Sequence, residues 1–149
     1  MKKCLIIYYS YHHGNTKKVA EAMAEACGAE LCPMEEAGGK NLDGYEIIGL
    51  GAGIDRGKHY APLFESAEKL NLKGRSVFVF STSGTGNKSY NDALIQKLKD
   101  GGAAVAGSFT CRGYDTQVLR LIGGIAKGHP DAGELEAAKT FAKSMVKDS

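Results

Sequence analysis

The chain turns at Ser10-Tyr11-His12-His13-Gly14-Asn15-Thr16, where an apolar run, Cys4 to Tyr9, gives way to a helical pattern that begins near Asn15. This order predicts a buried strand, a tight turn and a helix N-terminus. The first N–H groups of a helix have no intrahelical partner, and the helix dipole adds partial positive charge there. A phosphate can bind at such a turn without Lys or Arg. The alternative is an ordinary capped strand-to-helix turn.

The side chains of this turn favour the phosphate interpretation. Gly14 lets the backbone approach a ligand closely. Hydroxyl and amide donors are available from Ser10, Asn15 and Thr16, and His12 and His13 add ring N–H donors, or positive charge where one is protonated.

Composition narrows the class of protein. A chain of 149 residues with 43% hydrophobic residues suits one domain, 1–149, with a substantial core. Charged residues make up 24% with mixed sign and a net charge of +2, which argues against nucleic acid or a membrane surface as partner. The first apolar run is too short for a signal peptide or a membrane span, so we expect a cytoplasmic protein without stable membrane insertion.

Cysteine usage points to a reduced compartment. Cys4, Cys27, Cys32 and Cys111 show no C-x-x-C spacing. Structural disulfides and a zinc site are therefore not expected, and most of the four should be core residues.

The chain alternates between strand and helix periods. Buried strands are predicted at 4–9, 29–33, 45–51, 77–80 and 103–111, with 29–33 at the sheet edge because Pro33 ends it. Helical stripes lie between or after them, at 15–27 with Gly28 as stop, from Pro62 to Leu70, from a Ser89-x-x-Asp92 capping box to Gly101-Gly102, and around 135–146. This alternation predicts an α/β fold with a parallel sheet and right-handed crossovers.

Three Gly-rich or polar loops follow strands one, three and four, where the ligand crevice of a parallel sheet lies. The second contains Gly49, Gly51, Gly53 and Gly57, and the third runs from Ser81 to Ser89. Neither is a standard nucleotide motif, because Gly57 comes one residue late for a dinucleotide fingerprint and no Gly precedes Lys88 as in a P-loop. Their convergence predicts a phosphate-bearing ligand.

Together these motifs resemble the flavodoxin family from end to end. Flavodoxins carry Ser or Thr, two residues, then Gly-Asn-Thr, and here Ser10 and Gly14-Asn15-Thr16 match with one extra residue, His12-His13 replacing a single Thr. The resemblance implies a flavodoxin-like three-layer sandwich with a five-stranded parallel sheet of order 2-1-3-4-5 and helices on both faces. It also implies flavin mononucleotide (FMN), with residues 10–16 at its phosphate.

The resemblance implies that the other two loops enclose the flavin ring. The expected contacts are Ala52, Gly53, Ile54, Arg56, Gly57, Lys58, His59 and Tyr60 in the second loop, and Thr82, Ser83, Gly84, Thr85, Gly86, Asn87 and Tyr90 in the third. Tyr90 matches a stacking residue, which is favourable by about 0.5–1.5 kcal/mol. The chain has no Trp, so His59 or Tyr60 is the substitute in the second loop. The alternative for both tyrosines is a half-buried position at a helix start.

The second loop departs from electron-carrier flavodoxins, which are usually acidic. The sequence pI is 8.3, and Arg56, Lys58 and His59 lie in the loop expected to cover the ring. Such cations would stabilise a reduced, anionic flavin. This loop also resembles that of quinone-dependent protoporphyrinogen oxidases of the flavodoxin superfamily, although the chain lacks their longer insertion.

Two functional classes remain open. The first is a carrier that shuttles electrons between redox proteins, such as a flavin reductase and iron–sulfur proteins, as a monomer or weak homodimer. The second is an FMN-dependent oxidoreductase acting on a quinone or other small molecule. No catalytic triad, paired carboxylates or metal-ligand spacing falls at these loops, so an enzyme would rely on the flavin alone. A cofactor-free interaction module is a third possibility.

Overall fold

The computed structural model describes residues 1–9, 14–55, 58–59, 61–112 and 130–148. Its sheet contains five parallel strands in the order β2-β1-β3-β5-β6. Their bounds are β1 Cys4–Tyr9, β2 Glu30–Pro33, β3 Ile47–Asp55, β5 Ser76–Ser83 and β6 Ala104–Arg112. Counted along the parallel strands this is the predicted order 2-1-3-4-5, with 30–33 at the edge as expected.

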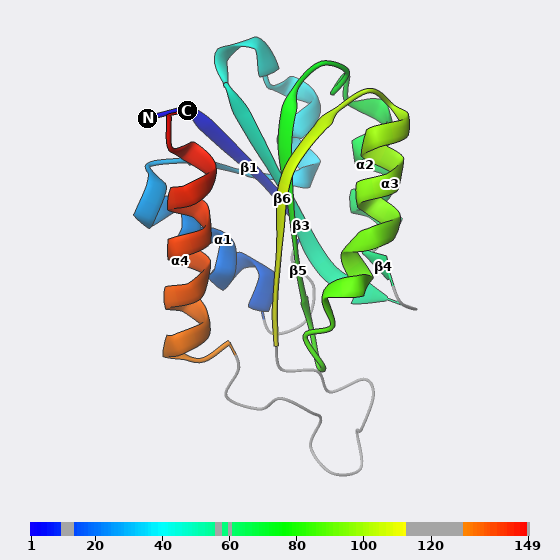
Figure 1. Ribbon diagram of the computed structural model, residues 1–149. Helices are drawn as coiled ribbons and strands as arrows, with labels where there is room; N and C mark the ends of the chain where they lie inside the picture. The colour runs from blue at the N-terminus through cyan, green and yellow to red at the C-terminus, as the bar shows by residue number, and fades with distance from the viewer. Residues whose placement is uncertain (10–13, 56–57, 60, 113–129, 149) are drawn as a thin grey trace.

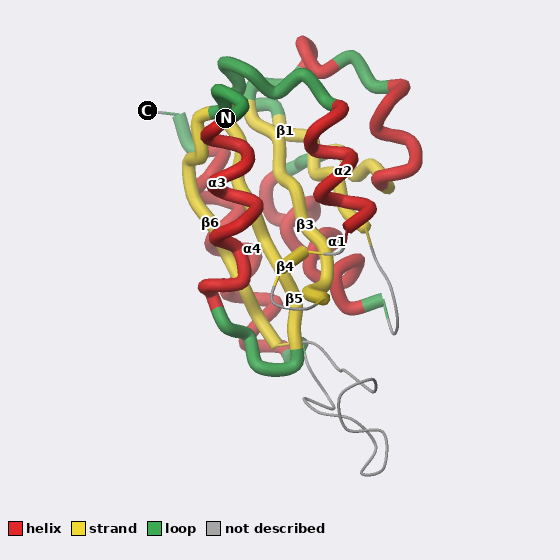
Figure 2. Tube along the Cα trace, turned by 90° about the vertical axis from the view of Figure 1, so that its right-hand side faces the viewer, coloured by secondary structure: helices red, strands yellow, loops and turns green. Residues whose placement is uncertain are grey.

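Two pairs of helices cover the sheet (Figures 1 and 2). α1 (Asn15–Cys27) and α4 (Ala132–Val146) lie on one face, and α2 (Ala61–Lys69) and α3 (Asp92–Asp100) on the other. Successive strand residues serve opposite faces, as the strand period requires. Ile6 of β1 packs with α1 and α4, for example, whereas Leu5 belongs to the core under α2 and α3. Because both faces are covered, the central strands have apolar residues on both faces along most of their length.

β3 runs past the predicted end at Gly51 to Asp55, and its glycines have a role in the core. Gly49 and Gly51 lie inside the strand and face Phe78 and Phe80 of β5. A Cβ on Gly49 would stand 2.3 Å from the Phe78 ring, and one on Gly51 would stand 2.2 Å from the Phe80 ring. These two glycines therefore make room for aromatic packing in the core and belong to no loop, which corrects that part of the sequence interpretation.

A short hairpin extends the carboxyl end of β3. β4 (Lys58–His59) pairs antiparallel with Ile54 and Asp55, so the expected second loop is largely a two-stranded extension of the sheet. The sequence analysis did not anticipate this strand.

The helix ends are set by local residues, and one of the predicted ends needs correction. Gly28 ends α1 in the left-handed conformation, φ 69°, and its N–H donates to the Ala24 carbonyl at 2.8 Å, as predicted. The predicted Ser89-x-x-Asp92 capping box does not form. Ser89 lies instead in a 3₁₀ turn, η3 (Lys88–Asn91), whose N-cap is Asn87, and α3 begins at Asp92.

Three further features complete the fold. Two 3₁₀ helices, η1 (Met34–Gly39) and η2 (Leu42–Gly44), connect β2 to β3. The terminal ammonium group of Met1 contacts Asp148 Oδ2 at 2.5 Å, so the two ends meet at the amino-terminal end of β1. Within the described ranges, no helix is long and apolar enough to cross a membrane.

Candidate functional site

The amino-terminal end of α1 meets the carboxyl ends of the central strands at the lower end of Figure 1. Gly14, the N-cap, has φ 65° and has no side chain with which to cap the helix. A Cβ on Gly14 would meet nothing within 4 Å, so its backbone faces open space. The first turn contains no acidic residue, and Lys17 and Lys18 are exposed. A helix N-terminus with a glycine N-cap, no acid in its first turn and two exposed lysines fits an anionic group such as phosphate.

A buried hydrogen bond joins α1 to the third loop. Thr16 Oγ1 lies 2.9 Å from Thr82 Oγ1, and either hydroxyl is able to donate. Thr16 is only 2% exposed, and its neighbour Asn15 only 8%. Thr82 is the second-last residue of β5, so this contact fixes the start of α1 against the strand that leads into the third loop. The structure thus brings Gly14, Asn15, Thr16 and Thr82 together.

The third loop is held by its own side chains. The Gly86 N–H donates to Ser83 Oγ at 2.8 Å, and Gly86 has φ 67°, which favours glycine. Asn87 Oδ1 accepts from both the N–H and the hydroxyl of Ser89, at 3.0 and 2.8 Å. Thr85 is exposed and Gly84 buried. Tyr90 is half-buried in η3, so part of its ring is accessible beside the loop.

The second loop is anchored by His59. This side chain is fully buried, and its Nε2 lies 2.8 Å from the Phe80 carbonyl oxygen in β5. Burial lowers the pKa of His59 to about 4, so the ring is neutral at physiological pH. A neutral ring with Nε2 against a carbonyl carries its proton there and donates it. His59 therefore adds no cation beside the site, contrary to the electrostatic role that the sequence suggested for it.

Ala52, Gly53 and Ile54, also expected in this loop, lie in β3. Ala52 is fully buried, while Gly53 and Ile54 are partly exposed at the strand end. The remaining site predictions fall outside the described residues. They are Ser10, Tyr11, His12, His13, Arg56, Gly57, Tyr60 and the side chain of Lys58.

Arg112 at the end of β6 was missed by the sequence analysis. Its Cγ lies 3.1 Å from the position of a Cβ on Gly86, and its Nε donates to the Gly84 carbonyl at 3.4 Å. Its backbone N–H donates to Glu134 Oε2 at 2.8 Å. Arg112 thus supports the third loop from the neighbouring strand. In the sequence, only the place of Arg112 at the carboxyl end of a strand could have indicated this supporting role.

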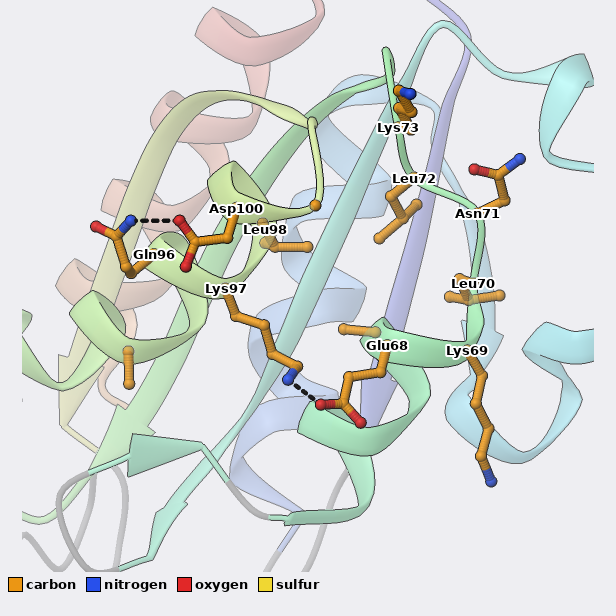
Figure 3. Close-up of a pocket in the computed structure, with 13 residues that line it drawn as sticks. Glu68, Lys69, Leu70, Asn71, Leu72, Lys73, Gln96, Lys97, Leu98 and Asp100 are labelled. Atoms are coloured by element: carbon orange, nitrogen blue, oxygen red, sulfur yellow. Dashed lines mark hydrogen bonds and ion pairs between the residues drawn. The ribbon is translucent and has the colours of Figure 1, made fainter.

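A surface hollow of about 930 Å³ lies elsewhere, between the C-terminal halves of α2 and α3 (Figure 3). Glu68 and Lys97 form an ion pair across it, and Gln96 donates to Asp100 on its rim. Both helices end near the amino-terminal ends of β5 and β6, so the hollow is opposite the strand ends that carry the candidate site. Among the described side chains, no group of three His, Cys, Asp or Glu residues could hold a metal ion.

Comparison with known proteins agrees with this architecture. A family model described as a flavodoxin domain matches residues 5–123. An uncharacterized protein of Methanocaldococcus jannaschii is 36% identical, covering 98% of this chain and 99% of that protein. A flavodoxin of Maridesulfovibrio salexigens is 34% identical, covering 72% of this chain and 83% of that one.

One solved structure adds to this comparison. The structure of a flavoprotein from Lactobacillus acidophilus in complex with FMN is 22% identical, with a TM-score of 0.60, and covers 75% of this chain and 93% of that one. This level of similarity shows a shared fold.

Proposed function

The chain belongs to the flavodoxin family, and from that premise we propose that it binds FMN at the carboxyl ends of β1, β3 and β5 and carries electrons between redox proteins. The N-terminus of α1, with Gly14 as its N-cap and tied to the third loop through Thr16 and Thr82, is the observation that carries this proposal. It offers the partial positive charge of a helix N-terminus and has no acidic residue in its first turn, as a phosphate monoester requires.

The described residues fit the parts of FMN. The first turn of α1 would hold the phosphate, with Lys17 and Lys18 lowering the energy of its negative charge. Tyr90 would lie against the ring, with η3 holding its backbone through the bond from the Tyr90 N–H to the Asn87 carbonyl at 3.2 Å. FMN supplies the one- and two-electron chemistry when bound, and the protein supplies position and electrostatics.

A carrier is preferred to an enzyme because the two buried titratable side chains at the described strand ends, His59 and Cys111, are not suited to acid–base or thiol chemistry. His59 is buried and neutral, and Cys111, also near this end, has its pKa raised to about 12, chiefly by burial. A general acid or base needs a pKa near the working pH, and a reactive thiol needs a lowered one. The redox partners would be a flavin reductase and iron–sulfur proteins, met in the cytoplasm by a monomer or weak homodimer.

Two measurements test this function. Heat release and mass analysis of the bound cofactor should give FMN; FAD or no flavin would overturn the site. Anaerobic photoreduction followed by absorbance should then pass through a persistent one-electron stage. Direct two-electron reduction, with turnover of a quinone, would instead favour the oxidoreductase alternative to which the basic second loop points.

A further inference from the structure

His59 is a polar residue at a fully buried position, where the fold alone would favour an apolar side chain. It is 0% exposed and stands among the largest fully buried side chains. Its Nε2 is bonded to the Phe80 carbonyl, but its Nδ1 is buried with no hydrogen-bond partner among the residues that the structure describes. A half-satisfied buried polar group destabilises a core compared with an apolar group of similar volume. Local departures of this kind are expected where function constrains the sequence.

The place of the bond indicates what that function is. His59 ends β4, a strand of two residues that pairs with the end of β3. β4 also packs against α3 and η3, the 3₁₀ turn that carries Tyr90. The imidazole therefore joins the hairpin of the second loop to β5, and the strand that carries it also packs against the turn that ends the third loop.

The Phe80 carbonyl lies two residues before Thr82, which is bonded to Thr16 at the start of α1. The second loop is thus fixed to the same strand end that fixes the phosphate-binding turn. Movement of the hairpin by a fraction of an ångström would alter the gap between the second and third loops, in which the flavin ring would lie.

We propose that His59 is a positioning residue that fastens the β3–β4 hairpin to the Phe80 carbonyl and so sets the distance at which the second loop meets the flavin. This proposal rests on the proposed FMN site. It assigns to His59 a role in cofactor affinity and reduction potential without direct contact between the imidazole and the flavin.

The test compares His59→Met with His59→Gln in the full-length chain. Methionine and glutamine side chains have similar length and flexibility, but only glutamine carries an N–H donor able to reach the Phe80 carbonyl. FMN dissociation constants would be measured by quenching of flavin fluorescence, and both one-electron potentials by redox titration. Val146 is buried at the C-terminal end of α4, the end away from the candidate site. Val146→Ala serves as a control for general loss of stability.

His59→Met should raise the FMN dissociation constant about tenfold and move at least one potential, while His59→Gln stays within about threefold of the wild type. Val146→Ala should lower the apoprotein's stability with little change in either quantity. Equal affinities and potentials for wild type, Met and Gln would overturn the proposal. So would equal losses in the Met and Gln variants, because the donor would then be irrelevant. A wild-type chain that does not bind FMN would overturn the proposed function itself, and with it this inference.

A measurement on the wild type covers the case in which His59→Met does not fold. The side-chain ¹⁵N resonances of His59 should identify a neutral ring protonated at Nε2, and exchange of that proton with solvent should slow at least tenfold when FMN binds. An exchange rate unchanged by FMN would show that the bond belongs to the apo fold alone and would contradict the positioning role.

Discussion

Thr16 and Thr82 lie 66 residues apart in the sequence and share a buried hydrogen bond of 2.9 Å between their hydroxyl oxygens. Each hydroxyl has one proton to donate. If Thr16 donates its proton to the phosphate of FMN, it must accept the proton of Thr82. Thr82 would then orient the Thr16 hydroxyl, and the Thr16 hydroxyl would bind the phosphate.

We expect Thr16→Val to weaken FMN binding more than it weakens the fold. The valine loses one neutral hydrogen bond in the apoprotein, which lowers the free energy of unfolding by about 1 kcal/mol. It also loses a charge-assisted bond to phosphate, of about 1.5–3 kcal/mol, or roughly a ten- to hundredfold rise in the FMN dissociation constant. Urea unfolding of the apoprotein and fluorescence titration with FMN measure the two effects.

Thr82→Val is the matched control, because it removes the same bond from the other side. It should destabilise the apoprotein by a similar amount, about 1 kcal/mol, but weaken FMN less than Thr16→Val does. Equal losses of FMN affinity in the two variants would show that the hydroxyl pair is only a structural link.

We expect Gly51→Ala to destabilise the core strongly, because its Cβ would stand 2.2 Å from atoms of the Phe80 ring. Such overpacking lowers the free energy of unfolding by about 1–3 kcal/mol or more. In a Phe80→Leu background the ring is absent, so the same alanine should be much less harmful. Denaturant unfolding of the four chains gives the coupling energy. Additive effects would mean that the strands move apart freely, contrary to the close packing seen here.

This glycine also illustrates what the sequence could and could not predict. The limits of α1, Asn15 to Cys27, were predicted correctly because the helical period, the turn before it and Gly28 after it are all local signals. Gly49 and Gly51 were placed at the end of the predicted strand 45–51 and also counted with the Gly-rich loop after it, because the reason for these glycines lies on another strand. The rings of Phe78 and Phe80 occupy the space beside them, and cross-strand register cannot be read from a single segment.

The candidate site, like the fold, could be predicted from the sequence only in part. Gly14, Asn15, Thr16 and Thr82 lie together because parallel strand ends share one edge, a rule that needs only the element order. The bond from His59 to Phe80 was not foreseeable, although Ile54-Asp55 and Lys58-His59, separated by Arg56-Gly57, have the spacing of a two-residue hairpin. Asn87 replaced Ser89 as a cap because its amide oxygen accepts both Ser89 donors at once.

We therefore expect Asn87→Ala to be more harmful than Ser89→Ala. The asparagine oxygen caps η3 and holds the third loop, and loss of a cap lowers the free energy of unfolding by about 0.5–2 kcal/mol. Ser89→Ala keeps the backbone bond and should change stability by less than about 0.5 kcal/mol. Thermal unfolding of both apoproteins checks the order, and the reverse order would restore the capping box predicted from the sequence.

Acid should destabilise the apoprotein partly through His59. The pKa of His59 is lowered by burial to about 4 in the folded state, whereas the unfolded chain has the ordinary value of about 6.5. Between these values the unfolded state binds more protons, so stability falls as the pH falls. At about 1.4 kcal/mol per pH unit, this contribution, absent above pH 7, reaches about 3 kcal/mol near pH 4.

His59→Gln isolates that contribution, because glutamine keeps a donor for the Phe80 carbonyl and does not titrate. The free energy of unfolding of both chains should be measured by urea denaturation from pH 8 to pH 4.5. The two chains share every titratable group other than His59, so those groups affect both curves alike. The wild-type curve should fall away from the glutamine curve below about pH 6.5, since only the wild type must keep an imidazole neutral in order to fold. Two parallel curves would mean that the imidazole is protonated as easily in the folded chain as in the unfolded one. The folded chain would then not hold a buried, neutral imidazole, and the positioning role that depends on it would be wrong.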